Sequence, residues 1–186
     1  MGVFKALLPW MGTTLLSHQV SVLREGGCNE IVVVAGHRAE DIKSELNGQD
    51  VLIIENPLFE AGRVSSIKAG VSAASSESDA YVLLGVDQPR TSKIVLELVR
   101  SHCDKKSPIT SPRFKGRGGH PVILSSCLRS ELLSMSEVSN GLRAVFDSHR
   151  SRMNRVPIYD SLVCLDLNEY HEYERAVEKY NPRLRN

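Results

Sequence analysis

Three oxygen-bearing side chains stand near the ends of two apolar runs. Asp87 directly follows the run 81–86, and Asp166 and Asn168 lie at the end of the run 162–167. Asp166 and Asn168 are two residues apart, so in an extended segment their side chains point to one face. Mg²⁺ takes oxygen ligands, commonly one or two carboxylates together with substrate phosphates. These residue types and positions therefore predict a magnesium site.

Each of these residues also has a purely structural interpretation. Asp87 could cap the helix expected from Ser92, or hold the turn that contains Gln88 and Pro89. Asn168 could cap the C-terminal helix, because Asn is common at that position. Capping and metal ligation are compatible for Asn168, so both interpretations stand.

Two further segments carry groups suited to an anion. Residues 62–66 lead into an expected helix, whose free amides and dipole, with the hydroxyls of Ser65 and Ser66, form a modest anion site. The glycine-rich loop 115–120 carries basic or titratable side chains, which are Lys115, Arg117 and His120. Helix capping and a plain surface hairpin explain the same residues. Lys5, taken alone, is typical of a solvated surface lysine.

Alternating apolar runs and helical patterns position these residues. Strands are expected at 31–35, 51–54, 81–86, 109–114, 121–124, 156–159 and 162–167. Helices are expected after Thr13 and Thr14 up to Gly26, and at 39–46, 65–74, 92–102, 127–135, 141–148 and 169–180. This order predicts an α/β fold of mostly parallel strands with helices on both faces. Ligands of such sheets bind beyond the carboxyl ends of the strands.

Bulk properties limit the classes of function. The 186 residues, 1–186, fit a single domain, and 23 basic against 22 acidic residues give no reason to expect a nucleic acid or a membrane surface as partner. The four cysteines form no CxxC pair, so neither a zinc site nor a disulfide framework is expected. Without a membrane-length apolar run or a signal-peptide pattern, the chain is predicted to be cytoplasmic.

Five short motifs, in the same order, resemble the MobA/MocA-like nucleotidyltransferases along nearly the whole chain. Residues 1–9, MGVFKALLP, resemble the second half of the family signature LAAGxSxRMGxxKxLLP. The other four are Asn56-Pro57 with 62–70 (NPxxxxGMxSSLRAG), 84–89 (LLxDQP), 116–122 (GRxGHPV) and 165–168 (LDIDTPED). The histidine-containing motif and the SSIKAG stretch point to the cytidylyl-type branch.

The resemblance implies a Rossmann-like three-layer α/β/α fold and a reaction. A nucleotide, CMP most of all, passes from a nucleoside triphosphate such as CTP to a phosphorylated acceptor such as molybdopterin, and pyrophosphate is released. Mg²⁺ is the implied cofactor, held by Asp87 with Asp166 or Asn168. Lys5 and Asp87 are the implied catalytic residues, Lys5 by contact with the triphosphate. The implied nucleotide- or acceptor-binding residues are Gly2, Lys5, Ser65, Ser66, Gln88, Arg117, Gly119 and His120.

Two departures from the family pattern leave other functions open. Asn168 stands where the family has a second carboxylate, and the half-signature LAAGxSxR, which supplies the first strand and a phosphate loop, has no counterpart here. That strand would be central, so the expected sheet lacks it and leaves strand edges unpaired in the core. A non-catalytic molybdenum-cofactor carrier or chaperone with a molybdoenzyme partner is one alternative. A nucleotidyltransferase for a different small-molecule acceptor is another.

Overall fold

The computed structural model describes residues 4–180, so Gly2 lies outside the described part of the chain. The strands are β1 (Pro9–Trp10), β2 (Thr13–Thr14), β3 (Val32–Ala35), β4 (Leu52–Glu55), β5 (Ala80–Leu83), β6 (Ile109–Phe114), β7 (Arg117–Gly118), β8 (Val122–Ser125) and β9 (Asn154–Pro157). The α-helices are α1 (Leu15–Glu25), α2 (Ala39–Glu45), α3 (Arg63–Ala73), α4 (Ser92–Lys105), α5 (Arg129–Ser134), α6 (Gly141–Ser148) and α7 (Tyr170–Tyr180). Short 3-10 turns are η1 (Lys5–Leu7), η2 (Phe59–Ala61), η3 (Ser126–Leu128), η4 (Arg150–Arg152) and η5 (Ser161–Cys164).

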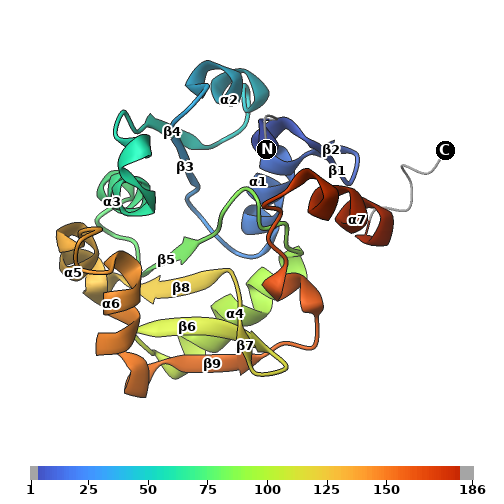
Figure 1. The fold of residues 1–186 in the computed structure, drawn as a ribbon. Coiled ribbons are helices and arrows are strands. Elements are labelled where there is room, and N and C mark those ends of the chain that lie inside the picture. Colours follow the sequence, from blue (N-terminus) through green and yellow to red (C-terminus); the bar gives the residue numbers. More distant parts are fainter. Residues whose placement is uncertain (1–3, 181–186) are drawn as a thin grey trace.

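The main strands form two sheets (Figure 1). β3 and β4 are a parallel pair, with Val32 opposite Leu52. In the other sheet β8 lies between β5 and β6, and β9 pairs with the second edge of β6. β6 and β9 are parallel, whereas β8 runs antiparallel to both its neighbours. The sheet is mixed because the β6–β7 hairpin turns the chain back before β8 begins.

Helices cover both faces of the larger sheet, which confirms the three-layer α/β/α arrangement. Tyr81 and Leu83 of β5 pack into one cluster with residues of α3, α5 and α6. Val82, between them, packs into another cluster with Ile94 and Leu98 of α4. Because successive side chains of a strand point to opposite faces, the two clusters lie on opposite sides of the sheet. Within residues 4–180, no helix has the length and hydropathy that crossing a membrane requires.

β3 of the smaller sheet and β5 of the larger sheet are neighbours, with a space between them. Glu30, just before β3, accepts a hydrogen bond from the amide of Ser75 at 3.0 Å and one from the hydroxyl of Ser78 at 3.4 Å, just before β5. The amino ends of β3 and β5 are therefore neighbours. A cavity of about 950 Å³ lies between the two strands. Among the described residues no strand occupies this position.

Most element boundaries agree with the sequence patterns. Thr14 caps α1 by accepting a hydrogen bond from the amide of Ser17, and α1 ends at Glu25, before Gly26. The expectation that Ser65 and Ser66 cap α3 is wrong. This helix begins earlier, at Arg63, and both serines lie in its first turn.

The expected strand 162–167 is also wrong. Asp160 accepts a hydrogen bond from the amide of Leu162 at 2.8 Å, which starts the turn η5. Beyond this turn the chain passes the end of the sheet, where the amide of Leu167 donates to the carbonyl of Asp87 at 2.8 Å. An apolar run of this length does not distinguish a buried turn from a strand.

Candidate active site

Gln88 lies at the centre of the candidate site. Its Oε1 accepts a hydrogen bond from the amide of Gly85 at 3.0 Å, which fixes the orientation of the side-chain amide. Its Nε2 then donates to Asp166 Oδ1 at 2.8 Å and lies 3.1 Å from His120 Nδ1. The residue is buried, so these bonds are shielded from water. Gln88 therefore ties the turn after β5 to the segment that carries Asp166 and to the loop that carries His120.

Asp87 and Asp166 are brought to the same place by the backbone. The hydrogen bond from Leu167 to the Asp87 carbonyl places the segment that contains Asp166 beside the turn after β5. Gly85 allows the Asp87 carboxylate to fold over this turn, because a Cβ at Gly85 would meet Asp87 Oδ1 at 2.5 Å. Asp166 remains 44% exposed. Asp87 therefore stands in the turn after β5, as the sequence predicts, and Asp166 lies beside it on a segment that was expected to be a strand.

Arg90 supports this site from within the core. Its side chain is fully buried and donates hydrogen bonds to backbone carbonyls at 2.8 to 3.1 Å; these belong to His120, Pro89, Leu165 and Val163. One guanidinium nitrogen lies 4.0 Å from Asp166 Oδ1. Burial lowers the pKa of Arg90 to about 10, and the charge of Asp166 opposes this shift. The guanidinium is thus charged at neutral pH and holds two loops together.

His120 is a neutral donor and acceptor in this environment. Burial lowers the pKa of its ring to about 4, and the charges of Arg63 and Arg90 act in the same direction. The charges of Asp166 and Asp87 oppose the shift. Because Gln88 Nε2 can only donate, Nδ1 of the neutral ring accepts, and Nε2 carries the proton. His120 therefore keeps one N–H donor.

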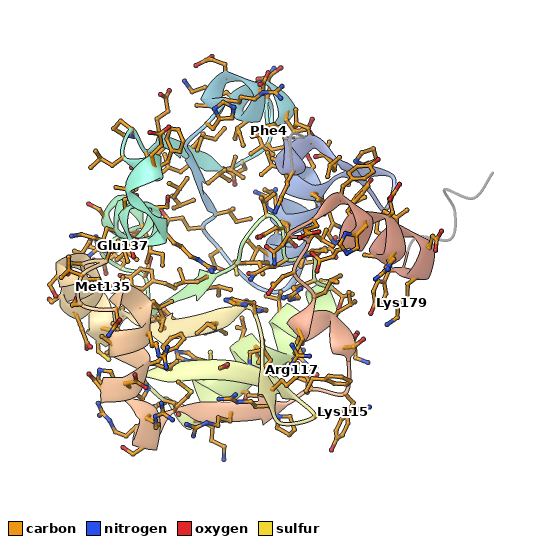
Figure 2. All side chains as sticks on the ribbon, viewed as in Figure 1. Phe4, Lys115, Arg117, Met135, Glu137 and Lys179 are labelled. Carbon is orange, nitrogen blue, oxygen red and sulfur yellow. The ribbon has the colours of Figure 1, made fainter. Side chains whose placement is uncertain are left out.

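The first turn of α3 contributes a second polar group. The side-chain amide of Asn56, which is buried, donates to the hydroxyls of Ser65 and Ser66 at 2.9 and 3.0 Å. The expected anion site at this helix start is taken by a carboxylate of the chain itself. Glu137 Oε1 accepts a hydrogen bond from the amide of Val64 at 2.9 Å. Figure 2 shows Glu137 beside α3.

Lys5 and Asn168 lie close to a third group, the start of α7. Glu172 accepts hydrogen bonds from the amides of Asn168 and Glu169 at 2.8 and 2.9 Å, which lower the pKa of Glu172. The charge of Lys5 adds to this lowering, so Lys5 and Glu172 are neighbours. At this helix start it is the Glu172 carboxylate that accepts the amide hydrogen bonds.

Only some residues of the loop 115–120 lie at the candidate site. Gly119 approaches the η5 turn so closely that a Cβ there would meet the carbonyl oxygen of Val163 at 2.1 Å. The amide of His120 donates to the same carbonyl at 2.9 Å. Arg117, in contrast, is exposed on the β6–β7 hairpin, near Lys115 in Figure 2. The structure therefore brings Gly119 and His120 to the site, while Arg117 lies on the exposed hairpin.

The donor set fits a metal ion that binds oxygen and shares its coordination with a substrate. Asp87 and Asp166 supply two carboxylates, the number that Mg²⁺ commonly takes from a protein when phosphates complete its shell. Among residues 4–180 no cluster of three or more His, Cys, Asp or Glu side chains could hold a metal alone. A closed site of the zinc type is therefore not formed by the described residues.

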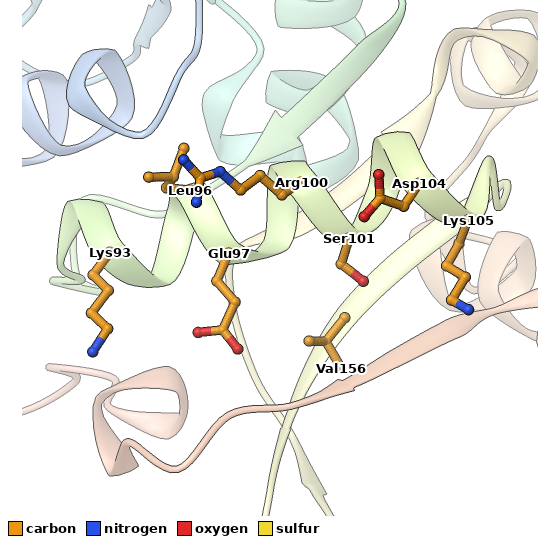
Figure 3. A pocket seen from close by; sticks show the side chains of 8 residues that line it. All are labelled: Lys93, Leu96, Glu97, Arg100, Ser101, Asp104, Lys105 and Val156. Atoms are coloured by element: carbon orange, nitrogen blue, oxygen red, sulfur yellow. The ribbon is translucent and has the colours of Figure 1, made fainter.

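A second hollow, of about 460 Å³, lies on the outer side of α4 against β9 (Figure 3). Its lining carries both signs of charge, with Lys93, Arg100 and Lys105 beside Glu97 and Asp104. None of the residues expected to carry function lines this hollow. It is a mixed-charge surface of the α4 helix.

Three residues of the candidate site have roles that the sequence patterns did not predict. Arg63 acts on the pKa of His120, Arg90 braces the loops, and Gln19 donates to the carbonyls of Gly85 and Gln88 at 2.8 and 2.6 Å. Arg90 follows the Asp87-Gln88-Pro89 motif directly, so its place beside the motif was a usable signal. Gln19 had no such signal, because its partners are 66 and 69 residues away.

Comparison with known proteins gives a match to a protein-family model and similarity to two named relatives. Residues 1–153 match the model of the MobA-like NTP transferase domain. The chain is 34% identical to the nicotine blue oxidoreductase of Paenarthrobacter nicotinovorans over 146 residues, 75% of this chain and 71% of the relative. It is 26% identical to the molybdenum cofactor cytidylyltransferase of Escherichia coli over 182 residues, 97% of this chain and 90% of the relative.

Solved structures agree on the fold. A nucleotidyl transferase from Methanothermobacter thermautotroptrophicus aligns with a TM-score of 0.81 and 22% identity, covering 97% of this chain and 87% of that one. Rv0371c from Mycobacterium tuberculosis, in complex with manganese, aligns with a TM-score of 0.74 and 23% identity, covering 94% and 91%. Motifs, fold and family model together place this chain in the family of MobA-like NTP transferase domains, which are nucleotidyltransferases.

Proposed function

We propose that this protein is a Mg²⁺-dependent nucleotidyltransferase that moves CMP from CTP to a phosphorylated acceptor of the molybdopterin type and releases pyrophosphate. The observation that carries the proposal is the pair Asp87 and Asp166, held at one strand end by Gln88. The similarity to the cytidylyltransferase of Escherichia coli along 97% of the chain supports the choice of base and acceptor. The manganese in a protein of the same fold supports a divalent metal.

In this proposal each residue has one task. Asp87 and Asp166 would hold the metal, which would supply positive charge to neutralise the phosphates. Asn168 can add an amide oxygen from the same segment. Lys5 places positive charge near the leaving pyrophosphate, where negative charge develops. No protein nucleophile takes part.

The remaining polar groups position the two substrates. Arg63 and the free N–H of His120 are cation and donor for phosphate or base oxygens, and the low pKa of His120 keeps this donor uncharged. Ser65 and Ser66 are expected to orient one substrate at the start of α3. Gly119 gives the His120 loop its close approach to the η5 turn.

The first test measures pyrophosphate release from CTP, GTP, ATP and UTP with molybdopterin and Mg²⁺. Activity should be greatest with CTP, disappear with EDTA and return with Mg²⁺ or Mn²⁺. The change Asp87→Asn should lower the rate at least about 100-fold, since it removes the charge that holds the metal at the phosphates. The melting temperature of the variant should stay close to that of the parent, because the Asp87 carbonyl still accepts from Leu167.

Asp147→Asn is the matched control. Asp147 pairs with Arg150 on the surface, so its loss should leave the rate unchanged. Equal rates for both variants, or no pyrophosphate with any triphosphate, would contradict the proposal. Molybdopterin binding without pyrophosphate release would instead favour a non-catalytic carrier or chaperone of the molybdenum cofactor. Activity with another phosphorylated acceptor would favour a nucleotidyltransferase for a different small molecule.

A second candidate activity is oxidation or reduction of an aromatic substrate. It is favoured by the 34% identity to a protein named nicotine blue oxidoreductase, which covers 71% of that relative. Incubation with nicotine blue and a nicotinamide cofactor, followed by absorbance, tests it. Turnover that survives EDTA and Asp87→Asn would favour this activity over nucleotide transfer.

A further inference from the structure

Gln19 of α1 holds the turn after β5, which spans residues 85–90. Its Nε2 donates hydrogen bonds to the carbonyls of Gly85 and Gln88 at 2.8 and 2.6 Å. Its Oε1 accepts a hydrogen bond from the amide of Arg90 at 3.4 Å. Because Nε2 can only donate and Oε1 can only accept, these bonds fix one orientation of the side-chain amide. Gln19 is buried, so water does not compete for its partners.

His18, the preceding residue, holds the far end of the same turn. Its ring Nε2 lies 2.8 Å from the carbonyl of Arg90 and must carry a proton, because a carbonyl can only accept. Burial lowers the pKa of His18, and the bond to Arg90 and the charge of Glu25 oppose this shift, so the ring is neutral at pH 7. The ring of Trp10 contacts that of His18 edge-on, with centroids 6.2 Å apart. We call His18 and Gln19 the α1 clamp.

The Asp87 carboxylate depends on the backbone of this turn for its position. Among residues 4–180 the carboxylate itself takes part in no hydrogen bond or ion pair. Asp166, in contrast, accepts a bond from the side chain of Gln88 directly at its carboxylate. A shift of the turn after β5 would therefore move the Asp87 carboxylate relative to Asp166.

α1 is anchored on its other side and so provides a firm support. The hydroxyls of Thr14 and Ser17 both donate to Glu45 of α2 at 2.7 Å. Ser17 and Gln19 are about 200° apart around the helix, so they point to nearly opposite sides. Figure 1 shows α1 beside the loop that follows β5. The helix thus links α2 to the turn that carries Asp87.

The same helix supports the segment that contains Lys5. Ala6, the next residue, packs in one cluster with Leu16 and Val20 of α1. α1 therefore sets the spacing between the Lys5 segment and the turn after β5.

We propose that the α1 clamp is a positioning element for the divalent metal, which it serves by keeping the Asp87 carboxylate beside Asp166. This inference rests on the proposed nucleotide transfer, which requires a metal at these carboxylates. The carbonyls that Gln19 holds, those of Gly85 and Gln88, flank Asp87 in the chain. Groups that orient metal ligands without touching the metal commonly change its affinity or the rate by about 10- to 100-fold.

The test compares Mn²⁺ binding by the parent, Gln19→Met and Val22→Ala. Methionine keeps the side-chain length and suits a helix, but it cannot donate. Val22 is buried on the same helix and makes none of the bonds to the turn, so Val22→Ala is a control for lost packing. Enhancement of water proton relaxation measures the protein-bound Mn²⁺, with and without CTP. Melting temperatures are recorded alongside and should fall in both variants.

We expect the dissociation constant of Mn²⁺ to rise at least about tenfold in Gln19→Met and to stay within about twofold in Val22→Ala. In the pyrophosphate assay the kcat of Gln19→Met should fall about tenfold at low Mg²⁺ and recover at high Mg²⁺. The KM for the acceptor should be unchanged. A purely structural defect would not respond to the metal concentration.

A pair of changes at His18 keeps the test decisive if Gln19→Met does not fold. His18→Phe retains a ring beside Trp10 but removes the donor to Arg90, whereas His18→Gln retains a donor. We expect the dissociation constant of Mn²⁺ to rise at least about threefold in His18→Phe, and His18→Gln to bind as the parent does.

Unchanged Mn²⁺ affinity in Gln19→Met, or in His18→Phe where that variant decides, would overturn the inference. An equal loss in Val22→Ala would also overturn it, since any weakening of α1 would then suffice. A parent that binds no Mn²⁺, with or without CTP, would overturn it together with the metal assignment. A parent that binds Mn²⁺ but releases no pyrophosphate would contradict the proposed function alone, and the affinities of the variants would still decide the inference.

Discussion

At the scale of single residues, the candidate site depends on side chains that bind both backbone carbonyls and other side chains. Gln88 and Arg90 each connect segments that are distant in sequence, through bonds of 2.8 to 3.1 Å. The carboxylates of Asp87 and Asp166 are left half exposed in front of them. A rigid support behind exposed carboxylates is the arrangement expected where a charged substrate arrives, because its groups need no reorganisation on binding.

Arg90→Gln tests this support. The change removes a buried charged donor and leaves the carbonyls of His120, Leu165 and Val163 short of partners. Each lost hydrogen bond to a charged group is worth about 1.5–3 kcal/mol, so a net loss of about 3 kcal/mol in the free energy of unfolding is expected. Thermal denaturation should show a midpoint lower by about 6–12 °C.

Arg100→Gln provides the comparison, because Arg100 is exposed on α4. Its effect should stay within about 0.5 kcal/mol. Equal midpoints for the two variants would show that the bonds of Arg90 contribute little to stability.

At the scale of elements, the site is assembled by contacts between a hairpin and the η5 turn. Gly119 and His120 follow β7 and touch Val163, and Leu167 beyond η5 bonds to Asp87. The close approach at Gly119 fixes the distance between the loop and the turn. A side chain at this position would separate them and so displace Asp166 from Gln88.

Gly119→Ala should therefore destabilise the protein. Its Cβ would meet a backbone oxygen at 2.1 Å, and overpacking of this kind costs about 1–3 kcal/mol. Gly118→Ala is a matched control one residue away, where the Cβ would meet only the movable guanidinium of Arg113 at 2.9 Å. Urea denaturation of both variants measures the difference, and similar midpoints would argue against the close contact.

The sequence was informative for features that depend on a local pattern of residues. Asp87, at the end of a buried run, and the bounds of α6 and β6 were all predicted. The strand expected at 162–167 was wrong because the side chain of Asp160 starts a turn that no periodicity reveals. Arg63 and Gln19 were not assigned, since their roles depend on contacts between distant segments. The position of Asp87 was thus predictable from the sequence, whereas the bonds that place Asp166 beside it were not.

At the scale of the whole molecule, the cavity between β3 and β5 lies between two sets of packed elements. One cluster joins α1, β3 and α2, and the others join β5, β6, β8 and β9 with α3 to α6. Helix contacts, such as that of Gly26 with Val95, and the bonds of Gln19 and Glu30 connect the two sets. Among residues 4–180 no backbone ladder joins β3 to β5 across this cavity.

The protein should therefore open in two steps. Native-state hydrogen exchange in low concentrations of denaturant should show β3 and β4 exchanging through a partial opening of lower free energy than the one that exposes β6 and β8. The reason is that the smaller sheet has only one ladder and one cluster to lose. A single common opening free energy for all four strands would show that the helices alone make the fold fully cooperative.

The cavity between β3 and β5 also bears on how the molecule responds to hydrostatic pressure. Unfolding eliminates internal void volume, and compression favours the state of smaller volume. The cavity of about 950 Å³ between β3 and β5 is a loosely packed region, in contrast to the dense packing of most protein interiors. Compression would favour an arrangement in which β3 and β5 lie closer together, and a shift of β5 would move the turn after it, which carries Asp87.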